Sequence, residues 1–405
     1  MTRTPPAPPR AEPALDEGDE RAGRSGFVAR ISVGKLFPAE TGAFVLLLGT
    51  TLFLVAFGLV MVLSSSSVES AADGEGSFSE FLTQGGAAMF GLPLMLIASR
   101  FPVSWWRALA LPAMLVAVVL QLLVFTGLGF EYGGNRNWLN LGFVNVQPSE
   151  VAKLALVLWL GKVLADRQHL LDDGKRLFGM VVPVAGIAIG LVLRGGDLGT
   201  ALVMAATVFG ILFYAGVRLR YLGGALLVAA LGVLVMLQTG GSRMERIQAW
   251  LSGCEGDYLG NCWQVQHGTW ALAAGGIFGV GLGNSKAKWS WLPEAEGDFI
   301  FAVIGEELGL LGAAVVLLLF VVLAVAFLRI VRTTPDPFAR LVTSAIMVWV
   351  LFQALVNIAV VLQVLPVLGV PLPLISSGGT SLLVTLVAIG VVLSFARARE
   401  PELQP

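Results

Sequence analysis

Five carboxylates stand where a polar loop gives way to a long apolar run. The segment 289–309 reads WSWLPEAEGDFIFAVIGEELG, apolar residues continue to about residue 328, and the acids are Glu294, Glu296, Asp298, Glu306 and Glu307. An acid in a hydrocarbon-spanning segment is energetically costly and commonly has a function. Two interpretations of Asp298 are open: a base that takes a proton from a bound substrate, or a cap for the helix that follows.

A second charged group lies in GGNRNWLNLGFVNVQPSEVAKLAL, residues 133–156. Pro148 suits the first turn of a helix, and Glu150 and Lys153, three residues apart, then lie on one helical face. A lysine in apolar surroundings is a good phosphate partner, and Arg136 is a second cation nearby. The alternative is that Glu150 and Lys153 only neutralise each other.

Two further polar turns separate apolar runs. In RGGDLGTALV, Asp197 lies near the start of a helix, where capping is its favoured role. In PLPLISSGGTSLL, small residues that include Ser376 and Gly378 open the last helix. Backbone N–H groups at such a helix start can bind an anion, whereas small residues can also simply allow close helix packing.

The elements that must position these residues are membrane-spanning helices. Hydrophobic residues make up 56% of the 405 residues, charged residues 13%, and the mean hydropathy is +0.82, which excludes an ordinary water-soluble domain. A span needs about 20 apolar residues, so we predict an all-α polytopic bundle of ten transmembrane helices. Their predicted ranges are 42–63, 82–99, 107–128, 149–166, 178–194, 198–215, 221–238, 299–328, 341–363 and 374–396.

The distribution of Lys and Arg predicts the orientation of the bundle. These residues concentrate in alternate connections, on the side of the N-terminus. The positive-inside rule therefore places both termini in the cytoplasm. We expect residues 1–40 to be a disordered cytoplasmic tail, residues 41–397 to form the membrane domain and residues 398–405 to be a short cytoplasmic tail.

The connection 239–297, between the seventh and eighth predicted helices, is expected to lie outside the cell. It is rich in Trp, so we expect short helices in the outer interface. It also holds both cysteines, Cys254 and Cys262, which are candidates for a disulfide in an oxidising compartment. Two unpaired thiols are the alternative, and no ligand pattern indicates zinc.

The motifs, taken in order, resemble one protein family. QPSE with a Lys three residues on, DLGTAL, GLGNS, LPEAxxDFIFAxIGEELG, FQALVN and PLISxGG are similar to those of the SEDS proteins (shape, elongation, division and sporulation; FtsW, RodA and SpoVE). The resemblance covers about residues 42–397. The LPEA form and FQALVN look more like the division branch, FtsW, than like RodA, and the cysteines and Trp-rich loop are similar to an actinobacterial FtsW.

The resemblance implies a peptidoglycan glycosyltransferase. Such an enzyme polymerises lipid II at the outer face of the cytoplasmic membrane, here at the division septum; an elongation role like that of RodA is the alternative. The implied partners are a class B penicillin-binding protein (FtsI-like) and other divisome proteins, with no nucleic acid. The acid proposed as catalytic in the family corresponds to Asp298.

Three positions depart from the family pattern. Glu296 and Gly297 stand where the family often has His-Thr, Asn137 stands where a basic residue commonly precedes the Trp, and Ser377 replaces an aromatic residue after PLIS. The role of Arg136 is therefore open, and no stacking function is expected at Ser377.

The transfer reaction itself needs one base. A β-1,4 bond formed from an α-linked lipid diphosphate inverts the anomeric centre, and the incoming 4-hydroxyl loses a proton, which we expect Asp298 to take. Diphosphate leaves readily once its charge is countered, so no second carboxyl is needed, unlike in glycosidases. No cofactor is required, and a divalent cation (Mg²⁺ or Mn²⁺) shared by carboxylates is an option. The predicted substrate-binding residues are Arg136, Glu150, Lys153, Asp197, Lys288, Glu294, Ser376 and Gly378.

Glu306 and Glu307 lie about 12–13.5 Å beyond Asp298 along a helix, too far for the same proton transfer. We expect one of them to pair with a basic or hydroxyl group of a neighbouring helix and so to stabilise the bundle; the alternative is that they line the groove that holds the lipid tail or a bound cation.

Two other functional classes are open. A lipid flippase would need polar residues that continue into the cytoplasmic half of the bundle, but the predicted helices become apolar there. A non-catalytic division scaffold would be indifferent to Asp298→Asn.

Overall fold

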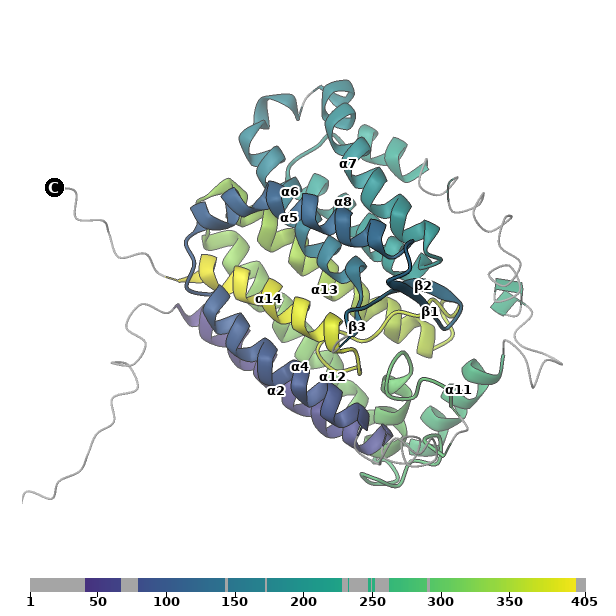
Figure 1. Cartoon of the computed structure of the whole chain (residues 1–405). Coiled ribbons are helices and arrows are strands. Elements are labelled where there is room, and N and C mark those ends of the chain that lie inside the picture. The colour runs from purple at the N-terminus through teal and green to yellow at the C-terminus, as the bar shows by residue number, and fades with distance from the viewer. Residues whose placement is uncertain are drawn as a thin grey trace, which may run out of the picture. The chain divides into compact units, whose positions relative to one another are not determined.

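The computed structural model describes residues 41–66, 79–142, 145–171, 173–227, 262–289 and 292–397, with a few single positions between 232 and 251. Long helices lie side by side, and a small sheet and a short helix gather at one end (Figure 1). Residues 219–227 are also helical. The elements are α2 (Gly42–Ser66), α4 (Ser79–Ala98), α5 (Val103–Leu123), β1 (Gly129–Tyr132), β2 (Asn135–Asn140), β3 (Asn145–Val146), α6 (Pro148–Asp166), η1 (Gln168–Leu170), α7 (Gly174–Arg194), α8 (Leu198–Tyr214), α11 (Trp263–Gly275), α12 (Ile300–Thr333), α13 (Pro337–Val361) and α14 (Gly379–Ala396).

Nine of the ten predicted spans coincide with described helices, namely α2, α4 to α8 and α12 to α14. The seventh, 221–238, is described as helical only as far as residue 227. Seven of the described helices are long and apolar enough to cross a membrane, and α8 is a shorter apolar helix. The predicted tails, 1–40 and 398–405, lie outside the described residues.

Some boundaries differ from the prediction. α5 ends at Leu123 instead of residue 128 because the backbone turns at Thr126, where Thr126 N donates to Leu123 O. α14 begins at Gly379 and not at residue 374, because a proline-rich loop continues up to Gly378. We call residues 366–378 the proline loop.

α13 and α14 occupy the interior of the bundle. Of the apolar windows of the seven span-length helices, those of α13 and α14 are 72% and 67% buried, against 28–44% for the others. α14 packs on α4, α12 on α2, α13 on α8 and α5 on α6. Trp349 of α13 is fully buried at this centre.

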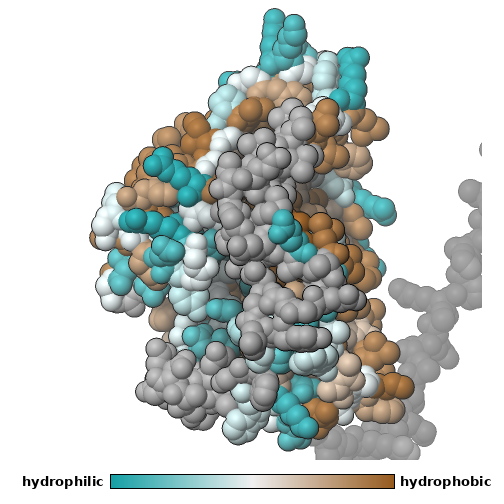
Figure 2. All heavy atoms as spheres, turned by 90° about the vertical axis from the view of Figure 1, so that its right-hand side faces the viewer, coloured by the Kyte–Doolittle hydropathy of each residue, from teal (hydrophilic) through white to brown (hydrophobic). Residues whose placement is uncertain are grey.

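The outer helices present large apolar side chains to their surroundings. Met89 and Phe90 on α4, Leu115 on α5 and Leu318 on α12 are 64%, 63%, 61% and 60% exposed. Exposed apolar surface of this extent suits contact with lipid and not with water. At the end that carries β1, β2 and α11, hydrophilic and hydrophobic side chains lie next to one another (Figure 2).

A small three-stranded sheet, ordered β1-β2-β3, occupies a connection that is predicted to be a loop. Gly133 and Gly134 form the two-residue turn between β1 and β2, with φ of 58° and 79°. Positive φ at both positions is what a type I′ hairpin turn requires. The rings of Phe130 and Trp138 stack across the hairpin, with centroids 6.4 Å apart.

α12 is interrupted at Gly309, where φ is 67° and ψ is −166°, although the sequence predicts an unbroken helix. Residues 275–283, which we call the glycine segment, run alongside the break. Val280 N and Gly281 N donate to the carbonyls of Glu306 and Glu307, at 2.9 and 3.0 Å. In return, the N–H groups of Leu310 and Leu311 donate to the carbonyls of Gly276 and Ile277, at 2.9 and 3.2 Å. The glycine segment thus replaces the helical hydrogen bonds that the break removes.

Candidate active site

Asp298 lies in a tight series of turns just before α12. Leu292, Ala295 and Phe299 of this segment are almost completely buried and anchor it. The N–H groups of Gly297 and Phe299 donate to Glu294 O at 3.1 and 3.2 Å, and Glu294 adopts a left-handed φ of 54°. This geometry leaves Asp298 half-buried at the end of the bundle where α12 begins.

α13 and the proline loop hold the backbone carbonyls of Gly297 and Asp298. Asn357 Nδ2 donates to Asp298 O and to Val370 O, both at 2.8 Å. Ser376 Oγ donates to Gly297 O at 2.7 Å and accepts from Leu372 N at 2.7 Å. These bonds tie the aspartate to two elements distant in sequence, which limits its movement.

Gly369 of the proline loop lies against the carboxylate. Its φ is 67°, and a β-carbon there would stand 3.5 Å from Asp298 Oδ2. The left-handed backbone favours glycine at this position, and the proline loop thereby forms one wall of the site.

Lys153 and Glu150 form a buried ion pair of 2.9 Å on α6, with both side chains 3% exposed. Lys153 Nζ also donates to Gln353 Oε1 at 3.0 Å and lies 4.8 Å from the centre of the Trp349 ring. Two buried oxygens beside the pair, Ser149 Oγ and Glu150 Oε2, have no hydrogen-bond partner among the described residues. Such atoms in a native protein are usually satisfied by water or ligand.

Gln353 and Asn357 connect the ion pair to the aspartate. They stand four residues apart on α13 and so share one face. Gln353 Nε2 donates to Pro371 O at 3.0 Å, next to the Val370 carbonyl that Asn357 binds. The FQALVN motif serves only as a family marker in the sequence analysis, but two amides four residues apart in an apolar helix were a usable signal.

α4 contributes two residues that the sequence analysis does not single out. Gln84 Nε2 donates to Ser376 O at 2.8 Å, and Gln84 Oε1 accepts from Gly378 N at 3.1 Å. Ser377 Oγ donates to Glu80 Oε2 at 2.8 Å. The Gly378 N–H, expected to meet an anion, is therefore bound by Gln84.

Tyr132, at the end of β1, reaches the segment that carries Asp298. Its hydroxyl donates to Glu294 Oε1 at 3.2 Å. The negative charge of Glu294, followed by partial burial and by Glu296 and Glu80, raises the pKa of Tyr132 to about 12. The hairpin thus places a neutral hydroxyl beside the acids Glu294, Glu296 and Glu80.

Two other predicted binding residues, Arg136 and Asp197, hold neighbouring elements in place. Arg136 donates through Nε to Val124 O at 3.0 Å and through Nη2 to Thr126 O at 2.8 Å, so it holds the end of α5. Asp197 caps α8 by accepting from Thr200 N at 2.8 Å, and it also accepts from Asn137 Nδ2 at 3.1 Å and Gln147 Nε2 at 3.3 Å. Asp197 has the capping geometry that the sequence favours.

Glu306, Glu307 and Lys288 form a separate buried group beside the glycine segment. Glu306 accepts from Ser285 Oγ and from Lys286 N, the latter at 2.9 Å. Glu307 accepts from Ser64 Oγ of α2 at 2.7 Å and lies 3.7 Å from Lys288 Nζ. The hydroxyl of Ser64 on the neighbouring helix α2 is a partner of the kind predicted for one of these acids.

Of the two cysteines, Cys262 lies at the start of α11 and is disulfide-bonded, and Cys254 lies outside the described residues.

Most of the chain is similar to known membrane proteins of one family. Residues 44–400 match the cell cycle protein family of FtsW, RodA and SpoVE. The chain belongs to this family. It is 37% identical over 396 residues to "Probable peptidoglycan glycosyltransferase FtsW" of Mycobacterium tuberculosis, an alignment that covers 97% of this chain and 75% of the relative.

Two solved structures place the fold in the FtsW/RodA/SpoVE family. One, titled "Structural coordination of polymerization and crosslinking by a peptidoglycan synthase complex", has a TM-score of 0.70 at 29% identity and covers 86% of this chain and 96% of that chain. The other, RodA of Thermus thermophilus, has a TM-score of 0.63 at 27% identity and covers 86% and 95%. The predicted family and the all-α polytopic membrane class are confirmed.

Proposed function

We propose that this chain is a peptidoglycan glycosyltransferase that polymerises lipid II during septal wall synthesis. Its family and the name of its mycobacterial relative support this activity. The observation that carries the proposal is the half-buried Asp298, whose backbone is held by Asn357 and whose neighbour Gly297 is held by Ser376. A base fixed at a helix start is the arrangement that proton abstraction from a bound hydroxyl requires.

Asp298 acts as the general base of an inverting transfer. Its carboxylate takes the proton of the acceptor 4-hydroxyl as that oxygen attacks the anomeric carbon of the donor. The bond from this carbon to the diphosphate oxygen breaks, and the lipid diphosphate leaves with its electron pair. Because the new bond forms on the face opposite the leaving group, the anomeric configuration changes from α to β.

Lys153 supplies positive charge on the diphosphate side. Among the described cations that the sequence singles out, it contacts the elements that hold Asp298, through Gln353 and Pro371. Arg136 instead holds the end of α5, and Lys288 pairs with Glu307 of α12. Ser149 and Glu150 place further polar oxygens beside Lys153.

No group of three or more His, Cys, Asp or Glu in the described ranges is arranged to hold a metal ion. Mg²⁺ is commonly bound through one or two carboxylates together with substrate phosphates. A divalent cation, Mg²⁺ or Mn²⁺, would in this proposal arrive with the diphosphate.

The chain is a membrane protein, and we propose that the Asp298 end faces outward with both termini in the cytoplasm, at the division septum. The positive-inside bias supports this orientation. A class B penicillin-binding protein is the proposed partner, since the structural neighbour belongs to a peptidoglycan synthase complex. Other divisome proteins would bind the same assembly.

The test is polymerisation of lipid II by the purified full-length chain together with its penicillin-binding partner. Asp298→Asn should lower the rate of glycan formation at least about 100-fold, the usual contribution of a general base. Glu131→Gln, a matched loss of charge at an exposed acid of β1, should leave the rate unchanged. Glycan chains formed at the wild-type rate by Asp298→Asn would refute the proposal and favour a scaffold or a flippase.

A further inference from the structure

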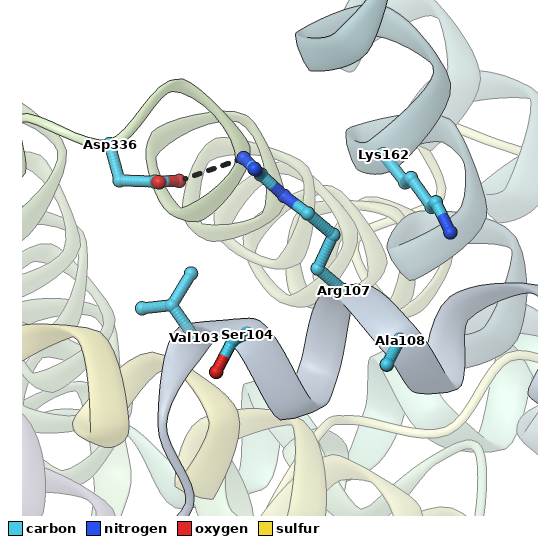
Figure 3. Close-up of a pocket in the computed structure, with 6 residues that line it drawn as sticks. All are labelled: Val103, Ser104, Arg107, Ala108, Lys162 and Asp336. Carbon is cyan, nitrogen blue, oxygen red and sulfur yellow. Dashed lines mark hydrogen bonds and ion pairs between the residues drawn. The ribbon is translucent and has the colours of Figure 1, made fainter.

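A hollow of about 380 Å³ lies between α5, α6 and α13, at the end of the bundle opposite Asp298. It is found where α5 and α13 begin and α6 approaches its end, and its lining residues are Val103, Ser104, Arg107, Ala108, Lys162 and Asp336 (Figure 3). α12 separates the two ends, since Asp298 precedes its first residue and Asp336 follows its last. The hollow therefore belongs to a different leaflet from the active site.

The hollow carries more positive than negative charge. Arg107 Nη2 pairs with Asp336 Oδ1 at 3.4 Å, and Asp336 also caps α13 by accepting from Ala339 N at 2.9 Å. Lys162 forms no ion pair or hydrogen bond within the described part of the chain, and its ammonium points away from the Arg107–Asp336 pair (Figure 3). Two cations and one carboxylate therefore line the hollow.

A second unpartnered donor points to an anionic ligand. Arg107 Nε is buried and has no hydrogen-bond partner among the described residues. The guanidinium is held in place by its ion pair and by the Phe338 ring, 5.2 Å from its carbon. A buried N–H without a partner is costly unless a ligand or water satisfies it.

The surface next to the hollow is apolar and favours a lipid over a soluble anion. Along α5, Ser104, Ala108, Leu111 and Leu115 follow one another at intervals of three or four residues and so form one stripe. Leu111 and Leu115 are 51% and 61% exposed. Trp105, 40% exposed and stacked on Phe101 with centroids 4.2 Å apart, is typical of the membrane–water interface.

We propose that this hollow binds the phosphate headgroup of an anionic phospholipid, whose acyl chain lies along the Leu111–Leu115 stripe. Lys162 and Arg107, which both line the hollow, supply the positive charge that the phosphate requires. Basic pockets between spanning helices on the cytoplasmic side are suited to anionic headgroups, and under the proposed orientation this is the cytoplasmic side. The site is independent of the transfer chemistry at Asp298.

Native mass spectrometry of the full-length protein, released from detergent after addition of phosphatidylglycerol, tests the proposal. The wild type and Lys175→Gln, which removes an exposed charge from the first turn of α7, should retain the lipid equally. Lys162→Gln should weaken retention about five- to tenfold. Ala108→Phe, which fills the hollow without changing its charge, should weaken it as well and covers the case that Lys162→Gln fails to fold.

Two further measurements in the same experiment identify the ligand. Phosphatidylcholine, which is zwitterionic, should be retained less than phosphatidylglycerol by the wild type. Inorganic phosphate, supplied in excess, should not displace phosphatidylglycerol. Equal retention of both lipids, unchanged retention by Lys162→Gln and Ala108→Phe, or displacement by inorganic phosphate would each overturn the assignment to a lipid headgroup.

Discussion

The buried pair of Lys153 and Glu150 shows how strongly one residue can matter at the centre of this bundle. Lys153→Met would leave the Glu150 carboxylate buried without its counter-charge, which typically destabilises a protein by about 3–5 kcal/mol. We therefore expect a large fall in the unfolding temperature, measured in detergent micelles by the intrinsic fluorescence of tryptophan.

The double variant Glu150→Gln with Lys153→Met is the control for that experiment. It removes both charges together, so most of the lost stability should return. If the single and double variants were equally unstable, the loss would come from packing against Trp349 and not from the uncompensated charge.

Tyr132 gives a prediction about pH. Its pKa is raised from 10.0 to about 12 in the folded chain, so folding favours the protonated phenol. Its contribution to stability is complete below pH 10 and is lost as the pH rises from 10 to about 12, because the unfolded chain ionises first.

The ultraviolet absorbance of the phenolate measures this directly. The difference between wild type and Tyr132→Phe should show one tyrosine that ionises near pH 12, and Glu294→Gln should move that step toward pH 10. A midpoint that stays near 12 in Glu294→Gln would mean that burial, and not the carboxylate, raises the pKa.

For individual site residues, the sequence identified the residues but not their partners. Asp298, Glu150 and Lys153 were recognisable because charges are rare in apolar runs. Gln84 and Tyr132 were not, because their contacts to Gly378 and Glu294 join segments far apart in the chain. Likewise, nothing in the local pattern around Arg136 or Lys288 revealed that backbone carbonyls and Glu307 would bind them.

Among the elements, the break in α12 depends on glycine. A β-carbon at Gly309 would lie 2.4 Å from Gly279 N and would also require a left-handed φ. We expect Gly309→Ala to separate the glycine segment from α12, to expose the buried Glu306 and Glu307, and to lower the unfolding temperature markedly.

Gly190→Ala is the matched control for that substitution. Gly190 lies in α7, and a β-carbon added there would meet no atom within 4 Å. Alanine in a helix is favoured over glycine by roughly 0.5–1 kcal/mol, so this variant should unfold at the wild-type temperature or slightly above it. Equal unfolding temperatures for both variants would show that the glycine segment does not depend on close contact with the break.

Long helices were predictable, whereas the elements at the active-site end were less so. Hydropathy alone locates nine of the described helices because each span needs a long apolar run. The hairpin is short and carries polar residues, so its pattern resembles that of a loop. The break in α12 leaves no clear hydropathy signal, since the run is apolar from Leu308 onward apart from glycines. Its cause lies in the pairing with residues 276–281.

For the whole molecule, the proposed orientation predicts which surfaces are accessible from outside the cell. In a background where both native cysteines are replaced by serine, Glu131→Cys should react with a membrane-impermeant maleimide in intact cells. Lys175→Cys should react only after the membrane is permeabilised, because α7 begins on the opposite side. Labelling of Lys175→Cys in intact cells would reverse the orientation and place Asp298 in the cytoplasm.

The central position of α13 and α14 also has a consequence for biosynthesis. These two most buried of the span-length helices come after the other described helices in the sequence, so α4, α6 and α8 enter the membrane before the helices on which they pack. A nascent chain that stops before Gly379 would leave the face of α4 that packs on α14 uncovered. The bundle would then pack only after α14 is complete. Membrane proteases should therefore remove shortened chains rapidly.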